Sequence, residues 1–194
     1  MFSDETKINR FGSDGLTWSW CRDGESLQPR NVTETTKHGG GHLMLWGCIT
    51  SSGIGYMCEI EGIMDQHLYK EILESELAET IEYYQLDTNN LTFQQDNDPK
   101  HTAKSVKEYL NDQDFKVMTW PAQSPDLNPI ENCWSYLKNK VYSYDTPASG
   151  LKELFRRIEE QWEKISPEYI KNLYESMPRR MLQVIKAKGR WTKY

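Results

Sequence analysis

The stretch "LTFQQDNDPKH" (Leu91–His101) decides the expected fold, because it carries a short run of β-type residues up to an acid and then breaks at Pro99. The run from Leu91 to Gln95 has the apolar and aromatic content of a strand, and the Asn, Asp and Pro that follow favour a turn. In sheets of this kind, ligand-binding side chains gather where strands end. The stretch therefore predicts that Asp96 lies at the tip of a strand, where acids from other segments can meet it.

The segments on either side of this stretch alternate between strand patterns and helix patterns. Strand patterns alternate apolar and polar residues, whereas helix patterns repeat apolar residues every three to five positions. This alternation predicts an α/β fold with a mixed sheet covered by helices. The expected strands are Met1–Glu5, Leu16–Arg22, a hairpin of His42–Ser51 with Ile54–Gly62 across Ser52-Gly53, the strand ending at Asp96, and Phe115–Met118; the expected helices are Asp65–Leu86, Thr102–Leu110, Pro147–Ile165 and Pro167–Lys188.

A proline-rich loop precedes one more expected helix. Three prolines fall within nine residues of "PAQSPDLNPIENCW" (Pro121–Trp134), and each restricts its own backbone and that of the residue before it. Asn128 is a good N-cap with Pro129 in the first turn, so a helix "IENCWSYLKNKVY" should follow. Glu131 then occupies the third helical position.

Length and composition favour one soluble folded domain. The chain has 194 residues and a hydrophobic fraction of 37%, which suffices for one sizeable core, so residues 1–194 are expected to form a single domain that includes the C-terminal helices from about residue 147. No segment approaches the apolar length of a membrane span, and no signal peptide is evident. The four cysteines form no C-x-x-C pair and are expected to be reduced and mostly buried.

Charge is distributed unevenly along the chain. The formal net charge is −6, yet residues 177–194 contain six basic residues and no acid, which leaves −12 on the preceding 176 residues. The basic end is either a phosphate-contacting patch or a solvated face of a terminal helix. The acidic remainder argues against strong non-specific binding of nucleic acid.

Three acids far apart in the sequence are the candidate functional groups. Taken singly, Asp96 can be a turn former and Glu131 a member of a variant capping box. However, a first strand that ends near Asp4 can lie beside the strand ending at Asp96, and the thirty-four residues between Asp96 and Glu131 can return a helix to the same edge. Three clustered carboxylates repel one another unless cations intervene, and a pair of divalent ions such as Mg²⁺ is the usual remedy. For His101 a structural role is favoured over catalysis.

Four motifs give the sequence a family resemblance. "FSDETKINRFGSDG" at Phe2, "GGGHLMLWGC" at Gly39, "FQQDNDPKHTA" at Phe93 and "WPAQSPDLNPIENCW" at Trp120 resemble the catalytic domain of transposases of the Tc/mariner superfamily, over nearly the whole chain. The spacing of thirty-four residues before the glutamate is similar to the Tc branch.

The resemblance implies an RNase H-like fold and a DDE-type, metal-dependent DNA transposase. It implies that Asp4, Asp96 and Glu131 are catalytic and bind two Mg²⁺ or Mn²⁺ ions. The implied partners are DNA, as transposon ends and a TA target, and a homodimer or a full-length transposase, and the implied location is the nucleus. Candidate DNA contacts are Lys100, His101, Arg179, Arg180, Lys186, Lys188 and Arg190.

Two departures from the family pattern bear on activity. The chain carries no helix-turn-helix modules, and it begins three residues before Asp4, so the first strand is expected to be short. One alternative is therefore a catalytically silent remnant that acts as an interaction or inhibitory module. Another is an RNase H-type nuclease that acts on RNA/DNA hybrids, which would share the fold and the metals but not the "SPDLNPIEN" context.

Overall fold

The computed structural model of the chain describes residues 1–11, 40–190 and 192, and the strand expected at Leu16–Arg22 lies outside these residues. The strands of the described part fall into two groups. One is an antiparallel sheet in the order β1-β2-β3, and the other is a parallel pair of β4 and β5. Their bounds are β1 Phe2–Asn9, β2 His42–Thr50, β3 Gly53–Glu59, β4 Thr92–Phe93 and β5 Lys116–Val117.

A parallel contact between β1 and the end of β4 joins the two groups. Phe2 pairs with Gln94, whose backbone N–H donates to Met1 O at 2.9 Å and whose O accepts from Ser3 N at 3.2 Å. The combined strand order is thus β3-β2-β1-β4-β5. The expectation that the first strand lies beside the strand ending at Asp96 is confirmed.

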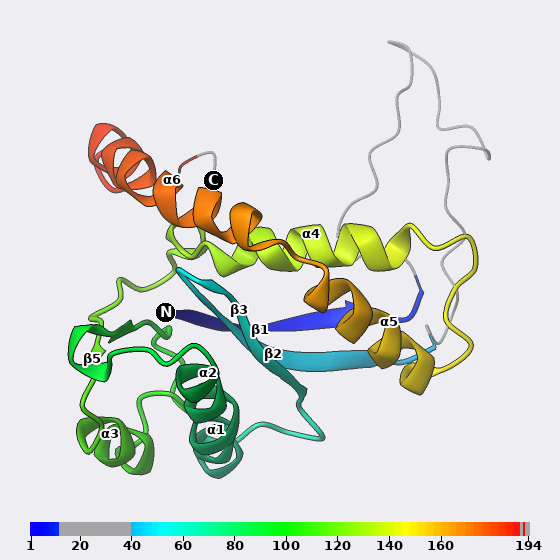
Figure 1. Ribbon diagram of the computed structural model, residues 1–194, viewed down its shortest axis with the longest axis horizontal. Helices are drawn as coiled ribbons and strands as arrows, with labels where there is room; N and C mark the ends of the chain where they lie inside the picture. Colours follow the sequence, from blue (N-terminus) through cyan, green and yellow to red (C-terminus); the bar gives the residue numbers. More distant parts are fainter. Residues whose placement is uncertain (12–39, 191, 193–194) are drawn as a thin grey trace.

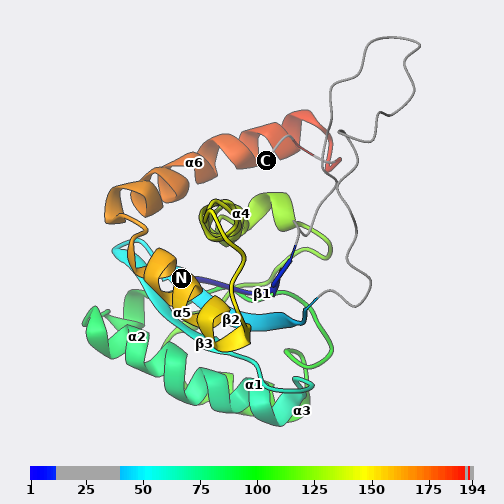
Figure 2. The same ribbon diagram turned by 90° about the vertical axis from the view of Figure 1, so that its right-hand side faces the viewer.

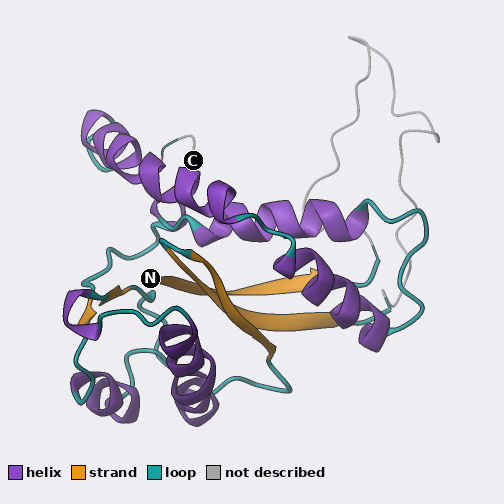
Figure 3. Ribbon diagram, in the orientation of Figure 1, coloured by secondary structure: helices purple, strands orange, loops and turns teal. Residues whose placement is uncertain are grey.

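Helices cover both faces of this sheet, which gives three layers (Figures 1 and 2). The helices of the chain's middle part cover one face, and the C-terminal helices cover the other (Figure 3). On the first face lie α1 Gln66–Ile72, the π-helical turn η2 Leu73–Leu77, α2 Ala78–Tyr83 and α3 Lys104–Asn111; on the second lie α4 Ile130–Tyr142, α5 Leu151–Glu163 and α6 Pro167–Lys186, and the short 3₁₀ turns η3 Thr88–Asn90 and η4 Pro125–Leu127 belong to connections. Among the described residues, no helix is both long and apolar enough to cross a bilayer.

The alternation of β2 explains why the protein has a core on each face. Trp46 and Cys48 are buried on the side of α1 and α3, whereas Leu45 and Ile49 are buried on the side of α4. Between them, Gly47 leaves room for a tryptophan of α4, because a Cβ at this position would lie 2.7 Å from the ring of Trp134. This close approach seats α4 directly on β2.

Several sequence expectations are confirmed, and four differ from the structure. The first strand, expected to be short and to end near Asp4, runs as β1 to Asn9 and pairs with β2 along its whole length. The hairpin is present, with β2 and β3 paired from Thr50 and Gly53 outwards. The helix expected at Asp65–Leu86 is interrupted by the π-helical turn η2. Buried Thr80 lies just beyond that turn, where its hydroxyl donates to Glu76 O at 2.7 Å and accepts from Tyr56 N at 2.9 Å.

The other two differences concern helix starts. Helix α5 begins at Leu151 rather than at Pro147, and Asn128 does not cap α4, which begins at Ile130 with Glu131 as its second residue. The side chain of Asn128 is used elsewhere, as described below. Ser166 does cap α6, since its hydroxyl accepts from Tyr169 N at 3.2 Å.

The cysteines of the described part are free thiols, with Cys48 and Cys133 buried and Cys58 partly buried. Burial raises the pKa of each of these thiols to about 12, so they are protonated at neutral pH. The expectation of reduced, mostly buried cysteines therefore holds for these three residues.

Candidate active site

Strand pairing brings the first two acids to one edge of the sheet. Because Phe2 pairs with Gln94 in parallel, Asp4 and Asp96 are each two residues further along neighbouring segments. Neighbouring strands lie about 5 Å apart. Asp4 is within β1, and Asp96 follows β4 at the point where the chain turns away.

Helix α4 brings the third acid over the same edge. Its buried residues Ile130, Cys133 and Trp134 face the sheet, which turns Glu131 toward β1 in the first helical turn. The loop before α4 is tied down from both sides. Asn128 Nδ2 donates to Ser3 O at 3.4 Å, and Asn97 Nδ2 donates to Trp120 O at 2.8 Å.

A pocket of about 300 Å³ lies where these segments meet. Its walls are the three acids, the turn after Asp96 and the proline-rich loop. Asn128 closes one side with a buried Oδ1 that accepts no hydrogen bond from the part of the chain that the structure describes. The lining residues are Asp4, Asp96, Asn97, Asp98, Trp120, Pro121, Ala122, Gln123, Ser124, Pro125, Asn128 and Glu131. The three predicted site residues therefore share one pocket.

Asp4 and Glu131 are a carboxyl pair held together by a proton. Burial, followed by the charges of Glu131 and Glu5, raises the pKa of Asp4 to about 8, and burial also raises the pKa of Glu131. A hydrogen bond joins the two carboxyl groups, which requires one of them to be protonated. Asp4 is further fixed by Glu5 N, which donates to Asp4 Oδ1 at 2.9 Å.

Asp96 has a different environment, because it lies against a histidine. His101 Nδ1 is 2.6 Å from Asp96 Oδ1, and His101 Nε2 is 3.0 Å from Glu5 Oε1. The hydrogen bond from His101 holds the pKa of Asp96 below its usual value. Burial by itself would lower the pKa of His101, but the hydrogen bonds to Asp96 and Glu5 outweigh it and raise that pKa to about 9.

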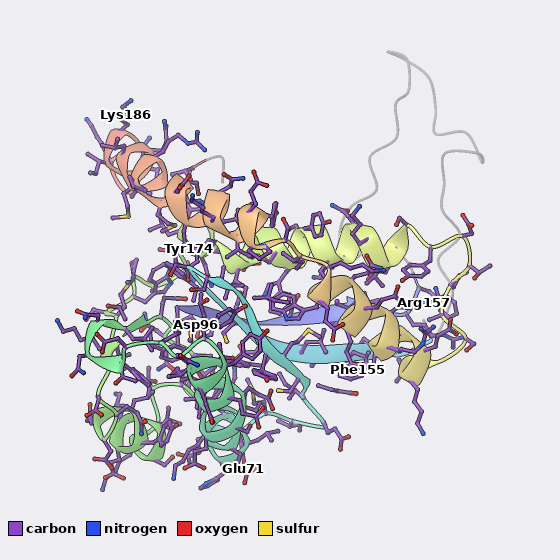
Figure 4. The ribbon with its side chains drawn as sticks, in the orientation of Figure 1. Glu71, Asp96, Phe155, Arg157, Tyr174 and Lys186 are labelled. Atoms are coloured by element: carbon purple, nitrogen blue, oxygen red, sulfur yellow. The ribbon has the colours of Figure 1, made fainter. Side chains whose placement is uncertain are left out.

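The expected DNA contacts divide into an internal group and an exposed group. His101 is buried, Lys100 lies 2.6 Å from Asp98, and Arg180, only 2% exposed, donates to Asp126 O at 3.0 Å and to Asn132 Oδ1 at 2.6 Å. Their contacts argue against a role for His101 and Arg180 in binding phosphate at the surface. The exposed group, in the C-terminal half of α6 or beyond its end, consists of Arg179, Lys186, Lys188 and Arg190, and Figure 4 shows Lys186 at the free end of that helix.

Sequence reasoning missed two members of the site. Glu5 reaches His101 from the opposite face of β1 to Asp4, and Asn128 lines the pocket instead of capping α4. The strict alternation of side chains along a strand was the available signal for Glu5, since it follows Asp4 directly. The local sequence contains no comparable signal for Asn128.

Comparisons with known proteins agree with the fold and the motifs. Residues 1–154 match the family described as DDE superfamily endonuclease. The Tcb2 transposase of Caenorhabditis briggsae is 40% identical over 196 residues, with 100% of this chain and 70% of that protein covered. The Tc1 transposase of Caenorhabditis elegans is also 40% identical, with the same coverage, and the Tc3 transposase of that organism is 33% identical over 97% of this chain and 56% of its own length.

Solved structures of the Mos1 transposase share the fold. The mariner Mos1 paired-end complex with Mg matches with a TM-score of 0.81 and 19% identity, over 99% of this chain and 56% of that chain. The catalytic domain of Mos1 alone matches with a TM-score of 0.71 and 18% identity, over 99% of this chain and 83% of that chain. The expected RNase H-like fold is thus confirmed. With a family match over residues 1–154 and relatives at 40% identity, the chain belongs to the DDE superfamily endonucleases, among the transposases of the Tc1 type.

Proposed function

We propose that this chain carries out the DNA strand cleavage and strand transfer of a DNA transposase, with Asp4, Asp96 and Glu131 binding two divalent ions, Mg²⁺ or Mn²⁺. The observation that carries the proposal is the shared pocket, to which β1, the turn after β4 and α4 each contribute one acid. Support comes from the Mos1 transposase, whose structures include complexes with Mg, with Mn and with a transposon end.

The donor groups of the pocket fit hard cations. Carboxylate and amide oxygens are the ligands that Mg²⁺ and Mn²⁺ prefer, and the described residues that line the pocket include no thiol. The raised pKa of Asp4 shows that its carboxylate form lacks a compensating positive charge, which a divalent ion would supply, and the Oδ1 of Asn128, without a partner among the described residues, offers a further oxygen ligand. The described residues contain no ready-made group of three His, Cys, Asp or Glu that could hold a metal, so binding requires the three acids to draw closer together around the ions.

The residues of the chain supply position and charge to this chemistry. When bound, divalent ions activate the attacking oxygen and stabilise the leaving oxygen at a phosphodiester. Glu5 N holds Asp4 in place, and Glu131 is held by the first turn of α4, whose positive dipole end favours its carboxylate form. The proline-rich loop forms the opposite wall, so that a phosphodiester in the pocket is confined between that loop and the acids.

We extend the proposal to the partners. The exposed basic residues in the C-terminal half of α6 and beyond its end would contact DNA phosphates, and they would make the affinity for DNA fall as the salt concentration rises. Two copies would act together on paired transposon ends, with TA as the target dinucleotide, and the protein would work in the nucleus. Support for DNA as the partner comes from the Mos1 transposase, which has been solved with a transposon end, and the remaining points rest on the family.

Cleavage of a duplex that carries the element's own terminal repeats tests the proposed activity. The parent chain should nick this duplex in Mn²⁺ and not in EDTA. The Asp96→Asn and Glu131→Gln variants should each lose at least about 100-fold in the rate of nicking, because each removes one of the three proposed metal ligands. The Asp114→Asn variant is the matched control, because it removes an acid from an exposed position away from the pocket. An Asp96→Asn variant that nicks as fast as the parent would disprove the assignment.

The same assay separates the alternatives. An RNA/DNA hybrid of the same sequence should not be cut in preference to the duplex, and preferential cutting would favour the RNase H-type reading. A chain that binds no Mn²⁺ and slows a full-length relative when mixed with it would instead be an inhibitory remnant.

A further inference from the structure

The ring of His101 connects two acids that come from different parts of the chain. Its Nδ1 lies 2.6 Å from Asp96 Oδ1 and its Nε2 lies 3.0 Å from Glu5 Oε1, while the side chain is only 3% exposed. Both acceptors are carboxylate oxygens, so each ring nitrogen points at a group that can fix its direction. The histidine is therefore clamped at both ends of its ring.

The ring and the backbone of His101 are also held by their neighbours. Tyr69, which is fully buried in α1, lies against the ring with centroids 4.0 Å apart. The Tyr69 hydroxyl donates to Gln95 Oε1 at 2.7 Å, and Gln95 Nε2 donates to His101 O at 3.2 Å. This closed circuit of three residues leaves the imidazole little freedom to shift.

The consequence for Asp96 is that its two oxygens have different surroundings. Oδ1 accepts from Asp98 N at 2.9 Å in addition to its contact with His101. Among the described residues, Oδ2 has no hydrogen-bond partner, and the Asp96 side chain is 52% exposed at the wall of the pocket. One oxygen is thus anchored and the other is available to a ligand.

We propose that His101 is a positioning residue for Asp96: it anchors Oδ1, directs Oδ2 toward the metal pocket, and is itself oriented by Glu5. The inference rests on the proposed function, because it gives the anchored carboxylate a divalent ion to bind. Residues behind a metal ligand that fix its orientation typically contribute 10- to 100-fold in metal affinity or activity. Strand β1 would then serve the site twice, with Asp4 on one face and Glu5 on the other.

Three substitutions at one position separate geometry from packing. His101→Phe keeps a flat ring against Tyr69 and removes both hydrogen bonds. His101→Asn places an amide nitrogen near the position of Nδ1, so it can still donate to Asp96, whereas His101→Gln places one near the position of Nε2 and reaches Glu5 instead. An exposed histidine in α1 provides the control variant, His67→Asn.

The primary measurement is the dissociation constant for Mn²⁺, determined by calorimetry on the full chain without DNA, with urea unfolding of each variant as the check on folding. We expect His101→Phe and His101→Gln to weaken Mn²⁺ binding by about 10- to 100-fold, and His101→Asn and His67→Asn to stay within about threefold of the parent. Duplex nicking should follow the same order, with the loss in kcat rather than in KM for DNA.

Two results would overturn the inference while leaving the proposed function intact. One is a His101→Phe variant that binds Mn²⁺ as tightly as a parent that binds and cleaves. The other is equal weakening in the Asn and Gln variants, which would mean that the direction of the hydrogen bond is irrelevant. A parent that binds no Mn²⁺ at all would overturn the proposed function and this inference with it.

Discussion

The Asp4→Asn substitution should stabilise the metal-free protein while it abolishes activity. In the parent, Asp4 and Glu131 share a proton in a buried site. Ionisation of Asp4 is therefore less favourable in the folded protein than in the unfolded chain. Asparagine has nearly the same shape, can accept from Glu5 N through its Oδ1 and can donate to Glu131 through its amide. The unfavourable charge contact is then replaced by a neutral hydrogen bond.

The magnitude follows from the two pKa values of Asp4. That pKa is 3.8 in an unstructured peptide and about 8 in the folded protein, so at pH 7 the folded chain holds a proton that the unfolded chain has released. At about 1.4 kcal/mol per pH unit, the interval from 3.8 to 7 corresponds to about 4 kcal/mol. Because Glu131 shares the proton, only part of this is recovered, and we expect Asp4→Asn to raise the free energy of unfolding by about 1–3 kcal/mol.

The sign of the pH dependence provides the assay. A raised carboxyl pKa contributes stability that is fully present below the unfolded value of 3.8 and is lost as the pH rises to about 8. Urea unfolding in EDTA should therefore show similar stability for parent and variant at about pH 4.5, and a growing advantage for the variant up to about pH 8.5. Millimolar Mn²⁺ should stabilise the parent alone. Equal stability of the two proteins at the higher pH in EDTA would refute the reasoning, and Asp114→Asn is the control for a simple loss of charge.

Three further substitutions test the packing around the site. Gly47→Ala places a methyl group against the buried ring of Trp134 and should destabilise the protein by about 1–3 kcal/mol in urea unfolding; unchanged stability would show that α4 can move away from β2. Arg180→Ala removes a buried guanidinium that joins α6 to the start of α4 and should lower the free energy of unfolding by about 2–4 kcal/mol. The control Arg179→Ala, at the exposed neighbouring position, should lower it by about 0.5 kcal/mol or less. Thermal unfolding of the two variants checks the difference. Ser166→Ala removes the N-cap of α6 and should lower the free energy of unfolding by about 1 kcal/mol, while Ser166→Asp should retain most of the stability of the parent.

Local patterns were sufficient to predict most elements and the meeting of the acids. The β-type run before Asp96 and the alternation in the hairpin depend on nearest neighbours in the sequence, so both could be read directly. The neighbouring positions of Asp4 and Asp96 followed from one further assumption, that the two strands lie side by side, and the bridge between Phe2 and Gln94 bears this out.

What the sequence did not indicate depends on contacts between distant residues. Asn128 looked like a helix cap because its neighbours have that pattern, but its amide donates to Ser3 O, 125 residues earlier in the chain. His101 and Glu5 are 96 residues apart, and only the folded sheet brings them together. The π-helical turn at Leu73–Leu77 had no sequence signal either, since the apolar spacing there also fits an ordinary helix.

The pairing of β1 with β2 fixes the face of the sheet on which each side chain of β1 lies. Asp4 lies opposite Gly47 and Glu5 lies opposite Trp46, so adjacent codons supply carboxyl groups to opposite sides of the sheet. Insertion or deletion of one codon between Glu5 and Asn9 would shift the preceding residues by one place against β2, which would exchange the faces of Asp4 and Glu5 and turn Phe2 away from its core. A single-codon change in length between Glu5 and Asn9 would therefore remove Asp4 from the pocket and Glu5 from His101 together, without replacing either side chain.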